Sequence, residues 1–140
     1  MTILHPQLAK DCLVIGNFPL CILLLMKDAN YPWFILVPDR EAVCEIFQLS
    51  ADDQQQLSRE SSLLAQYLVS EFEADKINIA ALGNIVPQLH IHHIARYKDD
   101  VAWPAPVWGA VQRKAYTENE LESLMNKLKT NPIKMLKFAS

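Results

Sequence analysis

Hydrophobic positions form short unbroken runs in the first part of the chain. Residues 20–26 and 33–37 are apolar runs typical of buried strands. A polar turn over residues 28–32 separates them, and Pro38 ends the second run. Two such strands joined by a short polar turn predict an antiparallel hairpin.

A long amphipathic helix is predicted over about residues 51–72. Ser50 suits the N-cap position, and Asp52 and Asp53 suit the positive end of the helix dipole. Large apolar side chains at helical spacing predict a stripe that packs in the core, made of Leu57, Leu64, Leu68 and Phe72. We expect the opposite side of this helix to be solvated, and it carries Gln54, Arg59 and Glu60.

The remaining elements complete a mixed fold. We expect a short helix at 40–47, a strand at 77–82, a strand at 87–97, and a last helix that begins at the capping box Thr117–Glu120 and ends near residue 129. This order predicts an α+β domain with a mostly antiparallel sheet, on which one long and one C-terminal helix pack. We expect a single domain over 1–140, with its core at about 20–100 and a C-terminal arm and helix over 101–140.

Composition narrows the class of protein. With 140 residues, 51% of them hydrophobic, and a net charge of −3, the chain lacks the basic surplus that binds nucleic acid or an acidic membrane. Only three glycines are present, which excludes a Gly-rich phosphate loop. Three cysteines without a CxxC pair predict a reducing, cytoplasmic location. The longest apolar run, 13–26, is too short for a membrane helix, and the N-terminus lacks the basic start of a signal peptide.

The most informative segment is the predicted strand at 87–97, which holds three of the four histidines. Because side chains alternate along a strand, Gln88, His90 and His92 are expected on one face and His93 on the other. Arg96 has the parity of the polar face. His93 interrupts an otherwise apolar face, so we interpret it as a hydrogen-bonded core or edge histidine.

Three interpretations of this polar row are open. The first is a half-exposed strand with solvated side chains. The second is a metal site whose third ligand would come from another strand or from Asp99, Asp100 or His5. The third is a centre of nucleophilic catalysis at phosphorus.

A resemblance to a known family favours the third interpretation. Residues 88–96, Gln-Leu-His-Ile-His-His-Ile-Ala-Arg, resemble the signature of the histidine triad (HIT) superfamily, in which three histidines alternate with apolar residues. Gln88 then stands in the first histidine place, His90 in the central place and His92 in the third. The run 34–38 resembles the family's strand that ends in Val-Pro, and Asn78 and Gly83-Asn84 resemble the positions before the triad.

The resemblance implies a function and a set of roles. The chain would be a nucleotide hydrolase or nucleotidyl transferase, acting as a homodimer on small nucleotides without a cofactor. His90 would attack the α-phosphorus to form a nucleotidyl-histidine intermediate, with its other ring nitrogen held by a backbone carbonyl. His92 would stabilise charge on the phosphate, and Gln88 would orient the phosphate or leaving group. Substrate contacts would come from Asn78, Asn84, Arg96 and Trp108.

Gln88 bears on the choice of substrate. The family's substrates are adenosine phosphoramidates in the Hint branch and dinucleoside polyphosphates in the Fhit branch. A glutamine cannot shuttle a proton, which favours leaving groups that depart as stabilised anions, and therefore dinucleoside polyphosphates. The alternatives are a HIT-like module that binds nucleotides with little turnover, and a metal-dependent enzyme.

The segment 103–109, Trp-Pro-Ala-Pro-Val-Trp-Gly, is stiff and aromatic. It is either a wall over the nucleotide or an arm that packs on the domain or on a dimer partner.

Overall fold

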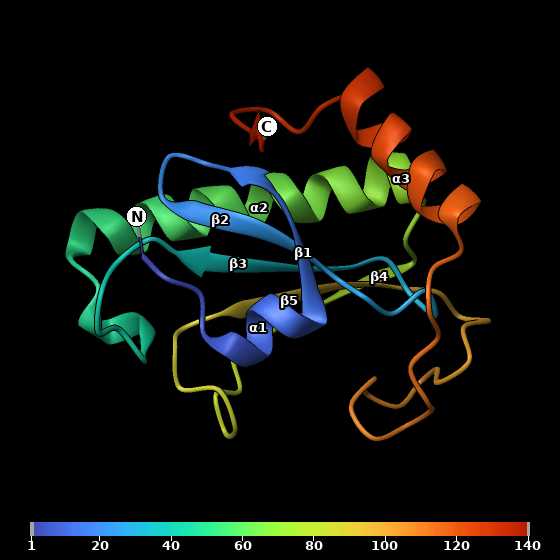
Figure 1. The fold of residues 1–140 in the computed structure, drawn as a ribbon, viewed down its shortest axis with the longest axis horizontal. Coiled ribbons are helices and arrows are strands. Elements are labelled where there is room, and N and C mark those ends of the chain that lie inside the picture. The colour runs from blue at the N-terminus through green and yellow to red at the C-terminus, as the bar shows by residue number, and fades with distance from the viewer. Residues whose placement is uncertain (1, 140) are drawn as a thin grey trace.

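Six strands form one antiparallel sheet in the computed structural model, which describes residues 2–139 (Figure 1). The strand order across the sheet is β4 (Lys76–Ala80), β5 (Ile91–Arg96), β3 (Trp33–Pro38), β2 (Cys21–Met26), β1 (Cys12–Asn17) and β6 (Lys137–Phe138). The hairpin predicted from the two apolar runs is present as the antiparallel pair β2 and β3.

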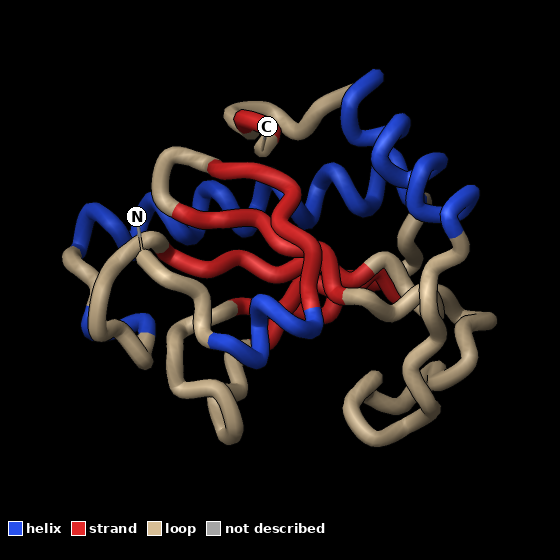
Figure 2. Tube along the Cα trace, viewed as in Figure 1, coloured by secondary structure: helices blue, strands red, loops and turns tan. Residues whose placement is uncertain are grey.

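Helices cover both faces of the sheet (Figure 2). The long helix α2 (Ala51–Phe72) and the later helix α3 (Glu118–Thr130) pack on one face, and the short helix α1 (Pro6–Asp11) packs on the other. Ser50 caps α2 by accepting from the amide of Asp53, and the capping box at Thr117 opens α3, as the sequence predicts. The α+β fold with an antiparallel sheet is therefore confirmed.

The two central strands are buried on both faces, which explains their unbroken apolar sequences. In β2 and β3 every residue is buried. Alternate side chains enter different cores: Leu23 and Phe34 pack beneath α2, whereas Leu24 and Ile35 pack beneath α1. A sheet enclosed in this way has no solvated face in its centre, so polar side chains there need partners within the protein.

Three predicted elements differ from those observed, and the strands β1 and β6 have no predicted counterpart. The strand expected from residue 87 begins at Ile91, because the chain before it makes other bonds, such as that from the amide of Leu89 to the carbonyl of Val43. The helix expected at 40–47 is only a 3-10 turn at Ile46–Gln48. The strand expected at 77–82 ends at Ala80. The apolar run at 13–26 contains most of β1 as well as β2. A turn separates these two strands, which pair antiparallel.

Glu60 lies in the core, contrary to the prediction that it is solvated. Its side chain has no exposed surface. One carboxylate oxygen accepts from the backbone amide of Leu20, and the other accepts from that of Cys21, both at 2.9 Å. Gln56 donates to the same carboxylate at 2.7 Å. The carboxylate therefore ties α2 to the start of β2, an interaction between distant segments that helical periodicity cannot reveal.

His93 lies on the α2 side of β5 and is fully buried, with both ring nitrogens hydrogen-bonded. Nδ1 donates to the carbonyl of Ile91 at 3.0 Å, and Nε2 accepts from the hydroxyl of Ser61 on α2 at 2.7 Å. This is the satisfied core histidine that the sequence interpretation expects. Burial lowers the pKa of His93 to about 4.

Among residues 2–139, none of the helices combines the length and the apolar character needed to cross a bilayer.

Lowering the pH from 7 to 5 is expected to reduce the free energy of unfolding. The unfolded chain takes up protons at its histidines as the pH falls below 6.5, whereas folded His93 stays neutral down to about pH 4 and folded His92 to about pH 3. The contribution of these two buried histidines to the free energy of unfolding is therefore complete above about pH 6.5, and it is lost progressively below that pH. Each histidine adds a slope that approaches about 1.4 kcal/mol per pH unit.

Urea denaturation at pH 7, 6 and 5 measures this slope, and His93→Gln provides the comparison. A glutamine amide can replace the two hydrogen bonds but does not titrate, so the variant should show a distinctly shallower pH dependence than the wild type. Equal slopes in the two proteins would contradict the assignment of a neutral, buried His93. Asp100, whose pKa is lowered to about 2, does not affect this slope, because its stabilising contribution is constant between pH 7 and 5 and is lost only at lower pH.

Candidate active site

A cavity of about 580 Å³ opens on the α1 side of the sheet. Its walls come from α1, from the loop that follows β4, and from the C-terminal arm, and its floor comes from the sheet. The volume lies in the range of small-molecule sites. The lining residues most relevant to chemistry are Trp33, Asn84, His90, His92, Trp108 and Arg113.

His90 is held by the backbone just before it. Its Nδ1 lies 2.7 Å from the carbonyl oxygen of Gln88. A carbonyl can only accept, so Nδ1 carries the proton, and Nε2 keeps its lone pair. The ring is buried by the protein and lines the cavity. The acceptor is a backbone carbonyl, the kind of group that the resemblance implies.

His92 presents the opposite tautomer. The indole Nε1 of Trp33 donates to its Nδ1 at 3.0 Å, so the proton of the neutral ring is on Nε2. The centres of the His90 and His92 rings are 5.0 Å apart. Burial, followed by the proximity of His90 and His93, lowers the pKa of His92 to about 3. The cavity thus receives one imidazole with a free electron pair beside one that offers a hydrogen.

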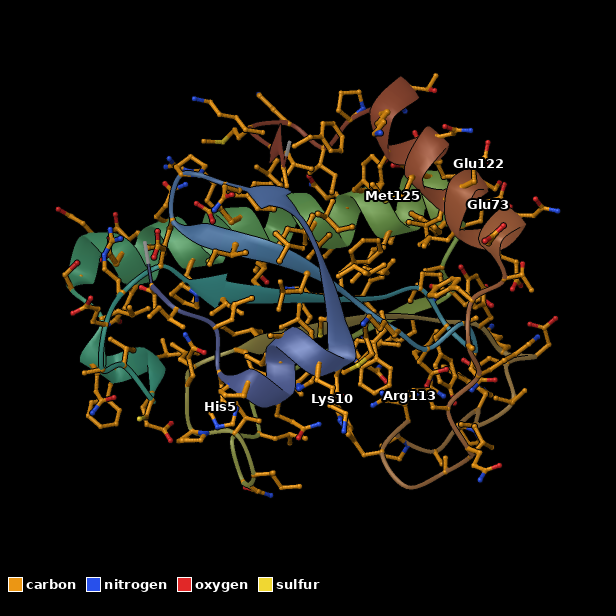
Figure 3. All side chains as sticks on the ribbon, in the orientation of Figure 1. His5, Lys10, Glu73, Arg113, Glu122 and Met125 are labelled. Atoms are coloured by element: carbon orange, nitrogen blue, oxygen red, sulfur yellow. The ribbon has the colours of Figure 1, made fainter. Side chains whose placement is uncertain are left out.

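The side chain of Gln88 lies away from the cavity. Its Oε1 accepts from the amide of His5 at 2.7 Å, and its Nε2 donates to the carbonyl of Ile3 at 3.2 Å. The amide therefore fixes the segment that leads into α1, and only the backbone carbonyl of Gln88 contacts His90. Figure 3 shows His5 on the segment that enters α1.

Arg96 and Asn78 also lie outside the cavity, although both were predicted to contact substrate. Arg96 is buried, and its guanidinium donates to both carboxylate oxygens of Asp100 and to the side-chain oxygen of Asn78. The ring faces of Tyr31 and Trp103 lie 5.5 and 5.6 Å from its central carbon. This network joins β4, β5 and the arm, and gives Arg96 and Asn78 structural partners.

Asn84 and Trp108 do line the cavity. Gly83, with φ at +73°, turns the chain immediately before Asn84 in a conformation that favours glycine. Trp108 meets His92 edge to face at 5.1 Å and meets Trp33 at 5.7 Å. The arm therefore packs on the domain, as one of the two sequence interpretations expects, and its Trp108 also lines the cavity.

Several cavity residues were missed by the sequence analysis. Trp33 was interpreted only as the start of an apolar strand, and no periodicity links it to His92, which is 59 residues away. Helix α1 has six residues, which is too short for a periodic signal, although Pro6 at its first turn is a typical start signal. Asp11 and Arg113 form an ion pair at 3.1 Å at the cavity, and Figure 3 shows Arg113 beside the end of α1.

The residues considered as a third metal ligand lie elsewhere. Asp100 accepts from Arg96, and Nδ1 of His5 accepts from the amide of Gln7. Within residues 2–139, no three side chains of His, Cys, Asp or Glu gather as metal ligands do. The arrangement is instead suited to nucleophilic chemistry: Nε2 of His90 can attack, and Nε2–H of His92 can donate to a developing charge.

Comparisons with known proteins agree with this geometry. The sequence profile described as the HIT domain matches residues 7–99. A histidine triad protein from Marinobacter aquaeolei VT8 has 46% sequence identity and a TM-score of 0.92, over 98% of this chain and 99% of that one.

Two further solved structures are similar. The histidine triad protein blr8122 from Bradyrhizobium japonicum has 46% identity and a TM-score of 0.89, over 91% of this chain and 96% of that one. The histidine triad protein SMc02904 from Sinorhizobium meliloti 1021 has 43% identity and a TM-score of 0.88, over 92% and 96%. No curated protein sequence matches the chain. A domain profile covering most of the chain, together with these three structures, shows that the protein belongs to the histidine triad (HIT) family.

Proposed function

We propose that the protein is a nucleotide hydrolase or nucleotidyl transferase that acts at the α-phosphorus through a nucleotidyl-histidine intermediate at His90. The observation that carries the proposal is the hydrogen bond from Nδ1 of His90 to the carbonyl of Gln88, which leaves the lone pair of Nε2 for attack within the cavity. Neutral imidazole is a competent nucleophile near pH 7.

The reaction has two displacements. Nε2 of His90 forms a bond to phosphorus, and the bond from phosphorus to the leaving group breaks with its electron pair going to the leaving atom. Water then attacks the phosphorus, the phosphorus–nitrogen bond breaks, and the proton of the attacking water passes to solvent. The nucleoside monophosphate leaves, and His90 regains its lone pair. In a transfer reaction the hydroxyl of an acceptor takes the place of water, and the nucleotidylated acceptor leaves. In both steps Nε2–H of His92 stabilises charge on the phosphoryl oxygens.

Substrate contacts are proposed for Asn84 and Trp108, because both line the cavity beside the histidines. Gln88 is proposed to occupy the first triad position, where its backbone carbonyl accepts from His90. Its side-chain amide holds the N-terminal segment. Arg96 and Asn78 are proposed to act on the substrate only indirectly, by fixing β4 against β5. Dinucleoside polyphosphates are the proposed substrate class.

The cytoplasmic location of the protein stays a prediction. It rests on its three cysteines, Cys12, Cys21 and Cys44, which are free thiols.

Rapid chemical quench with intact-mass analysis tests the intermediate. Incubation with a panel of dinucleoside polyphosphates and nucleoside phosphoramidates should give an adduct of one nucleoside monophosphate, and peptide mapping should place it on His90. His90→Ala should lose the adduct and at least about 10³-fold in turnover, because it removes the nucleophile, while still binding nucleotide.

The outcomes of that experiment separate the alternatives. An adduct mapped to His92 would contradict the assignment of the nucleophile. Nucleotide binding without an adduct or turnover on any member of the panel would instead favour the binding module.

Trp108→Ala tests the cavity wall. If the indole contacts the nucleotide, KM should rise by about tenfold, with a smaller change in kcat, because a uniform binding contact is removed. The unfolding midpoint in urea is measured alongside. A normal KM combined with a large loss of stability would show that the arm only packs on the domain.

A homodimer formed through the edge of the sheet is also proposed. Within residues 2–139, β4 pairs only with β5, so its outer edge is available to another strand. Ile79 on β4 is 51% exposed, and so is Val69 on the adjacent helix α2. Exposed apolar side chains beside an open edge are typical of a surface that pairs with a second copy.

Sedimentation equilibrium measures the state of assembly. The wild type should sediment at twice the mass of the chain, and Ile79→Arg should shift the protein to monomer. Val14→Arg is the control. Val14 is 48% exposed, but it lies on β1, which is near the far end of the strand order from β4. A monomeric wild type, or a dimer that survives Ile79→Arg, would contradict the proposed interface.

A further inference from the structure

We propose that Trp33 is a positioning residue that locks His92 as the neutral Nε2–H tautomer, so that His92 donates a hydrogen bond but delivers no proton to the leaving group. This inference rests on the proposed function and names the substrate class that the site favours: nucleotides whose leaving group is stable as an anion.

The hydrogen bond between the two side chains fixes the tautomer. Trp33 begins β3, and its indole Nε1 lies 3.0 Å from Nδ1 of His92 on the neighbouring strand β5. An indole N–H only donates, so it needs an acceptor, and Nδ1 can accept only when it carries no hydrogen. Protonation of Nδ1 would place two donors face to face and leave a buried indole N–H without a partner.

The donor is itself rigid. The Trp33 ring is buried and is held edge to face by Tyr31 at 6.3 Å and by Trp108 at 5.7 Å. The His92 ring meets Trp33 at 5.7 Å and Trp108 at 5.1 Å. Aromatic neighbours and the hydrogen bond between them therefore hold both rings, so the tautomer is set before a substrate arrives.

The groups around His92 do not favour an imidazolium. Its titratable neighbours along the chain are His93 on β5 and His90, which lies just before that strand. The residues opposite it on the adjacent strands are Ile35 and Ala80, and the arm contributes Trp108. The charged side chains that line the cavity, Asp11 and Arg113, are paired with each other. Burial therefore lowers the pKa of His92 to about 3 without a nearby carboxylate to oppose it.

This arrangement limits proton transfer in the cluster. His92 could release the Nε2 proton only by becoming an imidazolate anion, which is not accessible near pH 7. The Nδ1 proton of His90 is held by the carbonyl of Gln88, and the Gln88 amide is not an acid. The electron pair of the breaking bond must therefore stay on the leaving atom. A phosphate or polyphosphate oxygen carries that charge readily, whereas an amine nitrogen does not.

Nuclear magnetic resonance of ¹⁵N-labelled protein tests the hydrogen bond without any reference to turnover. Long-range ¹⁵N–¹H spectra should show wild-type His92 with Nδ1 unprotonated and Nε2 protonated, and without titration between pH 5 and 8. In Trp33→Phe the ring should become a mixture of tautomers, and its pKa should rise. Trp108→Phe is the matched control: it alters a ring packed on His92 but removes no donor to it, so the wild-type tautomer should persist.

A hydrogen on Nδ1 of wild-type His92, or titration of that ring between pH 5 and 8, would overturn the inference. The same holds if Trp33→Phe leaves both the tautomer and the titration unchanged. If Trp33→Phe does not fold, the wild-type spectra alone decide.

Kinetics test the consequence for substrates. With a series of nucleotide esters whose leaving groups span a range of basicity, kcat/KM of the wild type should fall steeply as the leaving group becomes more basic. Trp33→Phe should flatten this dependence and raise kcat on a nucleoside phosphoramidate below pH 6.5 by at least about tenfold relative to the polyphosphate, because general-acid catalysis becomes available. A change in KM alone would show that Trp33 is only a wall.

The two measurements keep the failures distinct. If the wild type shows the expected spectra but forms no adduct on His90, the proposed function fails and the leaving-group preference fails with it. If the adduct forms but the spectra differ, only the role of Trp33 fails.

Discussion

Every residue of β5 is buried, and so is His90 just before it, so the histidine rings of this segment depend on hydrogen-bond partners inside the protein. His93 has two partners, so neither of its ring nitrogens is left for a ligand. His90 and His92 each have one ring nitrogen fixed by the protein, by a backbone carbonyl in the first case and by an indole N–H in the second. Because one partner accepts and the other donates, the two rings adopt opposite tautomers. The Nε2 atoms thus offer an electron pair and a hydrogen to the same cavity.

The supporting residues show how such a site is built from distant parts of the chain. Gln88 contributes its carbonyl to His90 and its amide to the segment before α1, so His90 and one cavity wall share a single support. The ion pair of Arg96 and Asp100, with Asn78 on β4, fixes the base of the arm that carries Trp108 to the edge of the sheet.

The sequence predicted what depends on local patterns and on residue types that are close together in the chain. The hairpin, helix α2 with its Ser50 cap, and the capping box of α3 follow from periodicity and short-range hydrogen bonding. Alternation along β5 separated His93 from His90 and His92, and the motif around them indicated the family. The predicted start of β5 and the predicted helix at 40–47 were wrong. Backbone hydrogen bonds to other segments, such as that from Leu89 to Val43, outweigh local propensity there.

Only the tertiary structure decided which polar side chains face the cavity. Glu60 was expected in solvent and lies in the core, since its partners are amides about 40 residues away. Trp33 carried no chemical signal in the sequence, yet its indole N–H donates to a histidine 59 positions later. Patterns along the chain thus determined much of the secondary structure and the family, and they drew attention to His90. The tautomers, the cavity walls and the partners of the buried charges come from contacts between segments, because hydrogen bonds act over about 3 Å of space and not along the sequence.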